Sequence, residues 1–402
     1  MDAHLGETYG KTKPTWRPAP LPLGVKCRTK LMPRRKETNF SDIEDSYFNK
    51  KIEGDWITIY SSNSTLNKIP PSNVIILYLH GGGYFTCSRK SHRLITGTIC
   101  KSTKATVFAP SYSRAPENTF PLPLIDAISC YLNLIDPVNE NDVKYDPKNI
   151  VVMGDSAGGG MACALLLWLR ENPQYPMPAG VVGISPWLDM LLTFPSFVLN
   201  RSFDYLTGLV GDEFTERDPK HLNANRTHYY CKNDSELSNY LVSPIYAKHN
   251  KSDKNLPPIL IQVGTAELFR DECIAFYEKT LPNATIQLEL YENMVHVWCL
   301  FPSQIEPLSG ISLENISHFV KKVTNPDIVL ERSCTEIRKT KGNLFKSDKL
   351  LNPYKIVEEG RKEIQALHQL GKFNYINSFP TLPEGLVVGC TGCNECTIAV
   401  TN

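Results

Sequence analysis

The chain has 402 residues, of which 42% are hydrophobic and 21% charged, and its formal net charge is +1. This composition is typical of a soluble globular protein with a sizeable core, and a nearly neutral chain has no overall attraction for nucleic acid or an anionic membrane. No stretch approaches the roughly 20 apolar residues of a transmembrane helix, and the N-terminus lacks a signal-like apolar run. We therefore expect a cytoplasmic protein with reduced cysteines.

The first 54 residues are polar and contain several prolines, and we call this N-terminal segment the lead-in. We expect it to pack onto the rest of the protein late in folding or to contribute to a cap. From about residue 55, short apolar runs rich in β-branched residues alternate with longer segments of helical spacing. The strand-like runs are 74–79, 105–109, 150–153, 181–184, 259–263 and 286–291, and the helical segments include 122–135, 161–169 and 272–281. This alternation predicts an α/β domain over residues 55–325, with a mostly parallel sheet covered on both faces.

The alternation is interrupted between about residues 188 and 250, where an apolar stretch and then a polar one separate two predicted strands. An insertion at that place should lie over the strand ends as part of a cap. After about residue 325 the pattern stops, and residues 326–402 form a tail of unknown role with one helix expected near 357–370. Cys390, Cys393 and Cys396 have metal-like spacing without an adjacent fourth ligand, so we interpret them as thiols and predict no metal site.

The strongest motif is Gly154-Asp155-Ser156-Ala157-Gly158, between a predicted strand and a predicted helix. A serine on such a tight turn needs glycines two residues to either side, because neighbouring chain segments approach it closely. Ser156 is the predicted nucleophile. The Ala157 N–H at the helix start is a predicted donor to a developing oxyanion, with Gly154, Asp155 and Gly158 supporting the turn.

A second motif, His80-Gly81-Gly82-Gly83, directly follows the strand-like run 74–79. Its glycines leave main-chain N–H groups unobstructed, and we expect Gly81 and Gly82 to complete the oxyanion hole with Ala157. His80 and Gly83 are expected to support the loop. Glycine loops that bind phosphate carry a Lys-Ser/Thr pair or a G-x-G-x-x-G pattern, and both are absent here.

Four motifs in this order, HGGGYFT, Tyr112-Ser-Arg-Ala-Pro-Glu117, GDSAGGG and Ser185-Pro-Trp-Leu-Asp189, resemble the hormone-sensitive-lipase branch of the α/β-hydrolases. That branch also contains arylacetamide-deacetylase-like enzymes and microbial carboxylesterases. The resemblance covers roughly residues 70–305. It implies an α/β-hydrolase fold with an eight-stranded sheet flanked by helices, a helical cap, no cofactor, and hydrolysis of carboxylic esters with short or medium acyl chains.

His296 follows the last strand-like run, where a loop histidine can reach Ser156 as the general base. The acid that orients it should follow the preceding strand, in the segment from Gly264 to Glu272. Glu267 stands where the resembling family often has aspartate, and we predict it as the acid. Asp271 is the alternative, although acids at that place could instead stabilise a helix start.

These residues predict a serine hydrolase with a Ser-His-acid triad, acting on short- or medium-chain or acetyl esters of lipophilic alcohols. The alternatives are an amidase or lactonase with the same triad, or a non-catalytic binding protein on this fold, like the plant gibberellin receptors, which lack the histidine. The expected partner is a small lipophilic ester, not nucleic acid. Whether the chain forms a homodimer stays open.

Overall fold

Over the residues that the computed structural model describes, the strands form one ten-stranded sheet in the order β1-β2-β4-β3-β5-β6-β7-β8-β9-β10. The described residues are 18–38, 40–60, 72–206, 230–248, 256–280, 282, 284–340, 345–350 and 352–369. The strands are β1 (Val25–Met32), β2 (Ile52–Ile59), β3 (Ile75–Leu79), β4 (Thr106–Pro110), β5 (Ile150–Asp155), β6 (Gly180–Ile184), β7 (Ile259–Gly264), β8 (Ile286–Tyr291), β9 (Ser333–Lys339) and β10 (Phe345–Lys349).

The centre of the sheet is parallel from β4 to β9, and the pairs β1–β2, β2–β4 and β9–β10 are antiparallel. Every residue of β3, β4, β5, β6 and β7 is buried. A strand that is covered on both faces needs an unbroken apolar run, which is the pattern that these segments have in the sequence. The predicted α/β-hydrolase architecture is confirmed.

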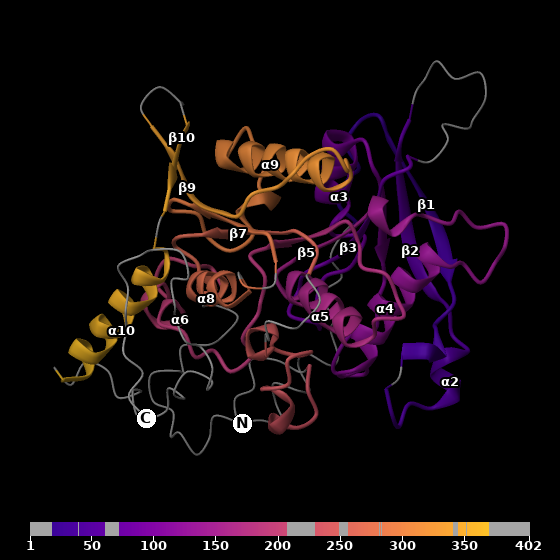
Figure 1. Cartoon of the computed structure of the whole chain (residues 1–402), viewed down its shortest axis with the longest axis horizontal. Helices are drawn as coiled ribbons and strands as arrows, with labels where there is room; N and C mark the ends of the chain where they lie inside the picture. The colour runs from indigo at the N-terminus through magenta and orange to yellow at the C-terminus, as the bar shows by residue number, and fades with distance from the viewer. Residues whose placement is uncertain are drawn as a thin grey trace.

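The main helices lie on both faces of the sheet (Figure 1). They are α3 (Arg93–Thr103) and α9 (Pro307–Val323) on one face, and α4 (Leu122–Ile135), α5 (Ala157–Glu171) and α8 (Arg270–Thr280) on the other. Successive strand residues point to opposite faces of the sheet. Tyr78 and Met153 pack in the cluster with α3 and α9. Leu79 and Val152 pack on the other face with α4, α5 and α8. The parallel strands therefore end together at one edge, where Ser156 follows β5.

The remaining elements are short, apart from α10 near the C-terminus. They are α2 (Asp45–Phe48), α6 (Ser196–Leu199), α10 (Tyr354–Gln369) and the 3₁₀ helices η1 (Lys36–Thr38), η2 (Pro147–Asn149), η5 (Asp234–Glu236), η6 (Pro244–Tyr246) and η7 (Trp298–Leu300). In the described part of the chain, no helix is both long enough and apolar enough to cross a membrane.

The sheet has ten strands, two more than the resemblance implies, and three of its outer strands come from segments outside the predicted α/β domain. β1 comes from the lead-in, and β9 and β10 come from the tail. These edge strands carry many charges; only Met32 is buried in β1, and only Cys334 and Ile337 are buried in β9. An edge strand that faces water on one side has no continuous apolar run, so its signal in the sequence is weak.

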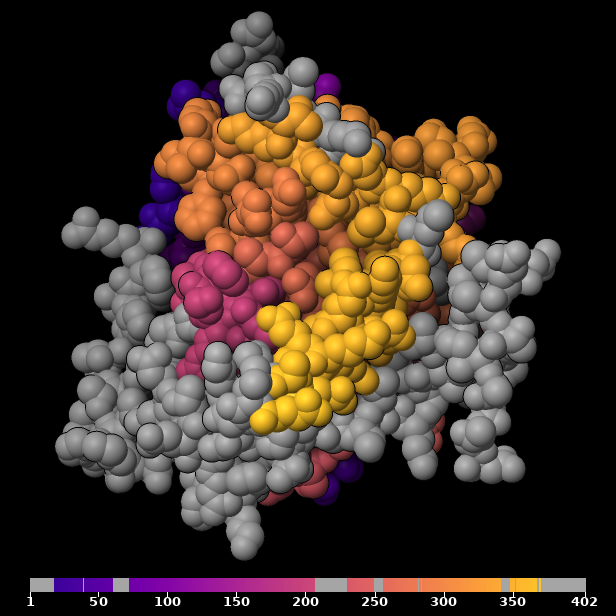
Figure 2. Space-filling model, turned by 90° about the vertical axis from the view of Figure 1, so that its left-hand side faces the viewer, coloured from indigo at the N-terminus to yellow at the C-terminus, as the bar shows by residue number. Residues whose placement is uncertain are grey.

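The helix expected near residues 357–370 is α10, which packs against α8 and α6 (Figure 2). A Cβ added at Gly360 would lie 2.9 Å from Pro195 Cβ, so α10 approaches the segment of α6 closely. The tail thus contacts the inserted segment instead of standing apart from the domain. Cys390, Cys393 and Cys396 lie outside the described residues.

Candidate active site

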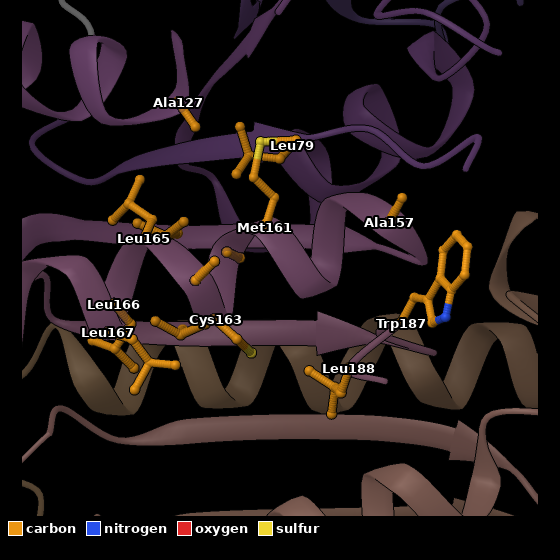
Figure 3. Packing of buried hydrophobic residues seen from close by; sticks show 14 of the residues in the cluster. Leu79, Ala127, Ala157, Met161, Cys163, Leu165, Leu166, Leu167, Trp187 and Leu188 are labelled. Atoms are coloured by element: carbon orange, nitrogen blue, oxygen red, sulfur yellow. The ribbon is translucent and has the colours of Figure 1, made fainter. Parts of the chain in front are cut away.

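Ser156 occupies the turn between β5 and α5, with φ 51° and ψ −125°. A serine in this region of backbone space is strained by about 1–3 kcal/mol, and such strain persists only where neighbours hold the backbone in place. Its N–H donates to Ile184 O at 2.9 Å, and its carbonyl accepts N–H groups from Gly160 and Trp187, each at 3.0 Å. Figure 3 shows Trp187 beside Ala157 at the start of α5. The turn has the geometry that the motif predicts.

The close approach predicted beside Ser156 occurs at Gly158, where α5 passes over the end of β3. A Cβ at Gly158 would overlap Leu79 O and lie 2.6 Å from His80 O. Both obstacles are main-chain atoms, so no side-chain rotation relieves the clash. The glycine is required here for packing, in addition to the conformation of the turn.

We expect Gly158→Ala to destabilise the protein by about 2–3 kcal/mol, although alanine is favoured over glycine in a helix by about 1 kcal/mol. Urea unfolding measures the change. Gly310→Ala in α9 is the matched control, because its Cβ would meet only Ser303 Cβ, at 3.4 Å. The control should be neutral or slightly stabilising. Equal unfolding midpoints for the two variants would contradict the close approach of α5 and β3.

Glu267 and His296 follow the adjacent parallel strands β7 and β8, and the structure brings the two side chains together. Glu267 Oε2 lies 3.2 Å from His296 Nδ1, and Glu267 Oε1 accepts the Gly264 N–H at 3.0 Å. Both side chains are buried. One carboxylate oxygen of Glu267 is therefore held by the main chain at the end of β7, and the other oxygen faces the imidazole of His296.

Aromatic rings connect His296 with the turn that holds Ser156. The ring of Phe269 meets the imidazole edge-on at 5.0 Å, and its face stacks on Trp187 at 5.6 Å. The main-chain N–H of Trp187 in turn donates to Ser156 O. These contacts place the imidazole on the same side of the sheet edge as the predicted nucleophile.

Burial raises the pKa of Glu267 above its ordinary value, and the nearby Asp204 raises it further. The hydrogen bond and charge of His296 act in the opposite direction and lower it. Because burial prevails, the carboxylate depends on the imidazole for its charged form.

Asp271, the alternative acid, has both carboxylate oxygens engaged elsewhere. Oδ1 pairs with Arg270 Nε at 2.7 Å, and Oδ2 accepts the Ser196 N–H at 2.8 Å. Glu272 likewise accepts the Leu188 N–H at 2.6 Å. These two acids join α8 to the segment that follows β6, and the geometry favours Glu267 as the partner of His296.

The expectation that Gly81 donates to an oxyanion is corrected by the structure. Its N–H donates to Asp155 Oδ1 at 3.0 Å, so this donor is already used. Gly82 and Gly83 adopt φ values of 112° and 60°. Within the described residues, no acceptor is bonded to the N–H of either glycine. These two N–H groups and the first N–H of α5, from Ala157, are therefore the candidate oxyanion donors.

Asp155 is the centre of a buried polar cluster under the glycine loop, which sequence reasoning missed. Besides Gly81, its Oδ1 accepts the Tyr78 hydroxyl at 2.8 Å, and its Oδ2 pairs with His92 Nε2 at 3.2 Å. Burial by itself would lower the pKa of His92, but the charge and hydrogen bond of Asp155 raise it above the ordinary value. No local motif marks His92, because its partner lies 63 residues away in the sequence.

His80 contacts the glycine loop that follows it. Its Nδ1 lies 2.8 Å from Gly81 O, and its ring stacks on Tyr112 with centroids 4.3 Å apart. Burial, with a smaller contribution from the charge of His92, lowers the pKa of His80 to about 3. A neutral, fully packed imidazole of this kind is suited to a structural role.

Asp204 is a further carboxylate at the site that sequence reasoning missed. Donor atoms of Asp204, Glu267 and His296 all lie within 4.8 Å of one another, and all three residues are buried. Within this cluster Glu267 Oε2 and His296 Nδ1 face each other at hydrogen-bond distance.

A family model described as the alpha/beta hydrolase fold matches residues 76–300. An acetyl-hydrolase of Streptomyces hygroscopicus is 32% identical over 224 residues, which cover 56% of this chain and 67% of that protein. An esterase of Acinetobacter venetianus is 29% identical over 246 residues, or 61% and 74% of the two chains. The solved structure of an esterase from the bacterial hormone-sensitive lipase family is 28% identical, with a TM-score of 0.58, and covers 76% of this chain and 87% of that one.

Proposed function

Because this chain belongs to the α/β hydrolase fold family, in its hormone-sensitive-lipase-like branch, we propose that it cleaves carboxylic esters with Ser156 as nucleophile, His296 as base and Glu267 as the orienting acid. It is a carboxylic ester hydrolase, as its esterase and acetyl-hydrolase relatives support. The observation that carries the assignment of residues is the strained turn at Ser156, beside the bonded pair of Glu267 and His296.

The reaction proceeds by two acyl transfers. His296 takes the proton of Ser156 as Oγ attacks the ester carbonyl. The resulting oxyanion accepts hydrogen bonds from the main-chain N–H groups of Gly82, Gly83 and Ala157. Collapse of this intermediate breaks the ester bond, and the imidazolium protonates the departing alcohol. A water molecule that gives a proton to His296 then attacks the acyl carbonyl. As the bond to Ser156 Oγ breaks and the acid leaves, the imidazolium returns a proton to Oγ.

Aromatic side chains next to the catalytic segments support a lipophilic substrate. Tyr84 follows the glycine loop and stacks on Tyr230 of the insertion at 3.7 Å. Trp187 and Phe269 stack on each other beside Ser156 and His296. Large apolar rings at these places favour an uncharged ester over a charged one. We propose acetyl esters and short- to medium-chain acyl esters of lipophilic alcohols as the substrate class.

A series of p-nitrophenyl esters from acetyl to dodecanoyl, with matching anilides, tests this proposal. We expect kcat/KM of about 10⁴ M⁻¹ s⁻¹ or more for the shorter esters, a fall for the longest chains, and slower cleavage of every anilide. Faster cleavage of the anilides would identify an amidase instead. If the purified protein binds the esters without turning them over, it is not the proposed hydrolase.

A further inference from the structure

Three polar side chains of the inserted segment face the loop that carries Glu267. Ser196, Asn200 and Asp204 are spaced four residues apart, and all three are buried. Because they recur at this interval over α6 and the turns after it, they lie along one side of the segment. That side is turned toward the connection between β7 and α8.

Ser196 and Asn200 bind the main chain of that connection. Ser196 Oγ donates to Leu268 O at 2.6 Å. Asn200 Nδ2 donates to Glu267 O at 2.8 Å and to Thr265 O at 3.1 Å. Both residues hold the loop through neutral hydrogen bonds, so they fix its position without adding charge.

Asp204 binds the same loop but also brings a charge to it. Oδ2 accepts the Leu268 N–H at 2.9 Å, and Oδ1 accepts the Leu206 N–H at 3.2 Å. Its carboxylate lies within 4.8 Å of the nearest donor atoms of Glu267 and His296. Two carboxylates therefore stand beside one imidazole, although a serine triad needs only one.

We propose that Asp204 is a positioning residue for the triad: it holds the Glu267 loop through Leu268 and adds a second negative charge beside His296. This inference rests on the proposed hydrolase mechanism and deepens it. The charge favours the imidazolium that forms when Ser156 attacks, because opposite charges at this distance stabilise each other in a buried site.

The negative charge of Asp204 sets the direction in which it shifts the pH dependence of activity. A negative group favours the protonated forms of its neighbours, and Asp204 accordingly raises the pKa of Glu267. Removing the charge should make the triad harder to protonate, so that activity persists to lower pH. The titratable groups that interact with Glu267 from the surrounding elements are His296, Cys299, Asp204, Tyr205, Glu272 and Cys273.

The test is the pH profile of kcat/KM for p-nitrophenyl acetate with Asp204→Asn and Asn200→Ala. Asp204→Asn removes the charge but keeps an oxygen that can accept the Leu268 N–H. We expect the acid limb of this variant's pH profile to move about one pH unit to lower pH. Its kcat should fall about tenfold, since one pKa unit is a factor of ten in an equilibrium. Asn200→Ala loosens the same loop without changing charge, and should lower kcat about three- to tenfold with its acid limb unmoved.

Asp204→Glu is the rescue variant, because it restores the charge with imperfect geometry. Its acid limb should return to that of the unmodified protein even where kcat stays low. If Asp204→Asn folds and its acid limb does not move, or if Asn200→Ala moves it equally, the inference is wrong. Should Asp204→Asn fail to fold, an acid limb of Asp204→Glu that moves to lower pH overturns it.

Fluorophosphonate labelling of the unmodified protein separates this result from the proposed function. If Ser156 is labelled and the Asp204 variants behave like the unmodified protein, only the role of Asp204 is lost. If the unmodified protein is neither labelled nor active, the hydrolase mechanism itself fails.

Discussion

Ser156→Ala is expected to lower kcat for p-nitrophenyl acetate by about 10⁶-fold and to abolish labelling by a fluorophosphonate. The turn holds the serine hydroxyl at the start of α5, where its strained backbone is fixed by Ile184, Gly160 and Trp187. Without that hydroxyl no acyl-enzyme forms, and only the oxyanion donors and substrate binding remain to assist direct attack by water.

Mass spectrometry of the intact protein, together with initial rates, measures this prediction. Ser317→Ala is the matched control: that serine is also buried, but its hydroxyl donates to Ser102 O, between α9 and the end of α3. The control should be labelled and active. An adduct that persists in Ser156→Ala, or equal losses in both variants, would assign the nucleophile to another residue.

Glu267→Gln should lower kcat by about 10²–10⁴-fold while leaving the nucleophile and oxyanion donors in place. In the proposed mechanism the carboxylate, 3.2 Å from His296 Nδ1, accepts the Nδ1–H, which fixes the ring tautomer and stabilises the imidazolium. Glutamine has nearly the same shape but no charge, and its amide can present a hydrogen to Nδ1. The loss should therefore appear mainly in kcat and little in KM.

Asp271→Asn is the comparison that decides between the two candidate acids. Its carboxylate pairs with Arg270 and accepts the Ser196 N–H, so the substitution should cost about 1–3 kcal/mol of stability and little turnover. Thermal melts and kcat for both variants give the answer. Near-normal turnover in Glu267→Gln with collapse in a folded Asp271→Asn would transfer the role of acid to Asp271.

The carboxylate of Asp155 connects the glycine loop with the turn that holds Ser156. Asp155 accepts the Gly81 N–H and pairs with His92, so the loop after β3 is tied to the same turn that holds Ser156. Burial of Asp155 would by itself raise its pKa, but the charge and hydrogen bond of His92 lower it below the ordinary value. The ionised carboxylate can then hold the loop so that Gly82 and Gly83 remain available.

The parts of this protein that local sequence determines are those whose physical cause lies within a few consecutive residues. The buried strands appear as unbroken apolar runs because both of their faces are covered. The turn at Ser156 is evident because glycines must stand two residues away from a crowded serine. The positions of Glu267 and His296 follow from the same logic, since each lies in the loop after one of two neighbouring strands.

Tertiary structure alone decided the features that depend on partners distant in the chain. Gly81 and Asp155 lie 74 residues apart, and nothing near Gly81 indicates that its N–H is already used. Asp204 and Leu268 lie 64 residues apart, so the second carboxylate at the triad has no local signature. β9 and β10 also lack a clear local signal. An edge strand has water on one side, and its stability comes from the strand with which it pairs.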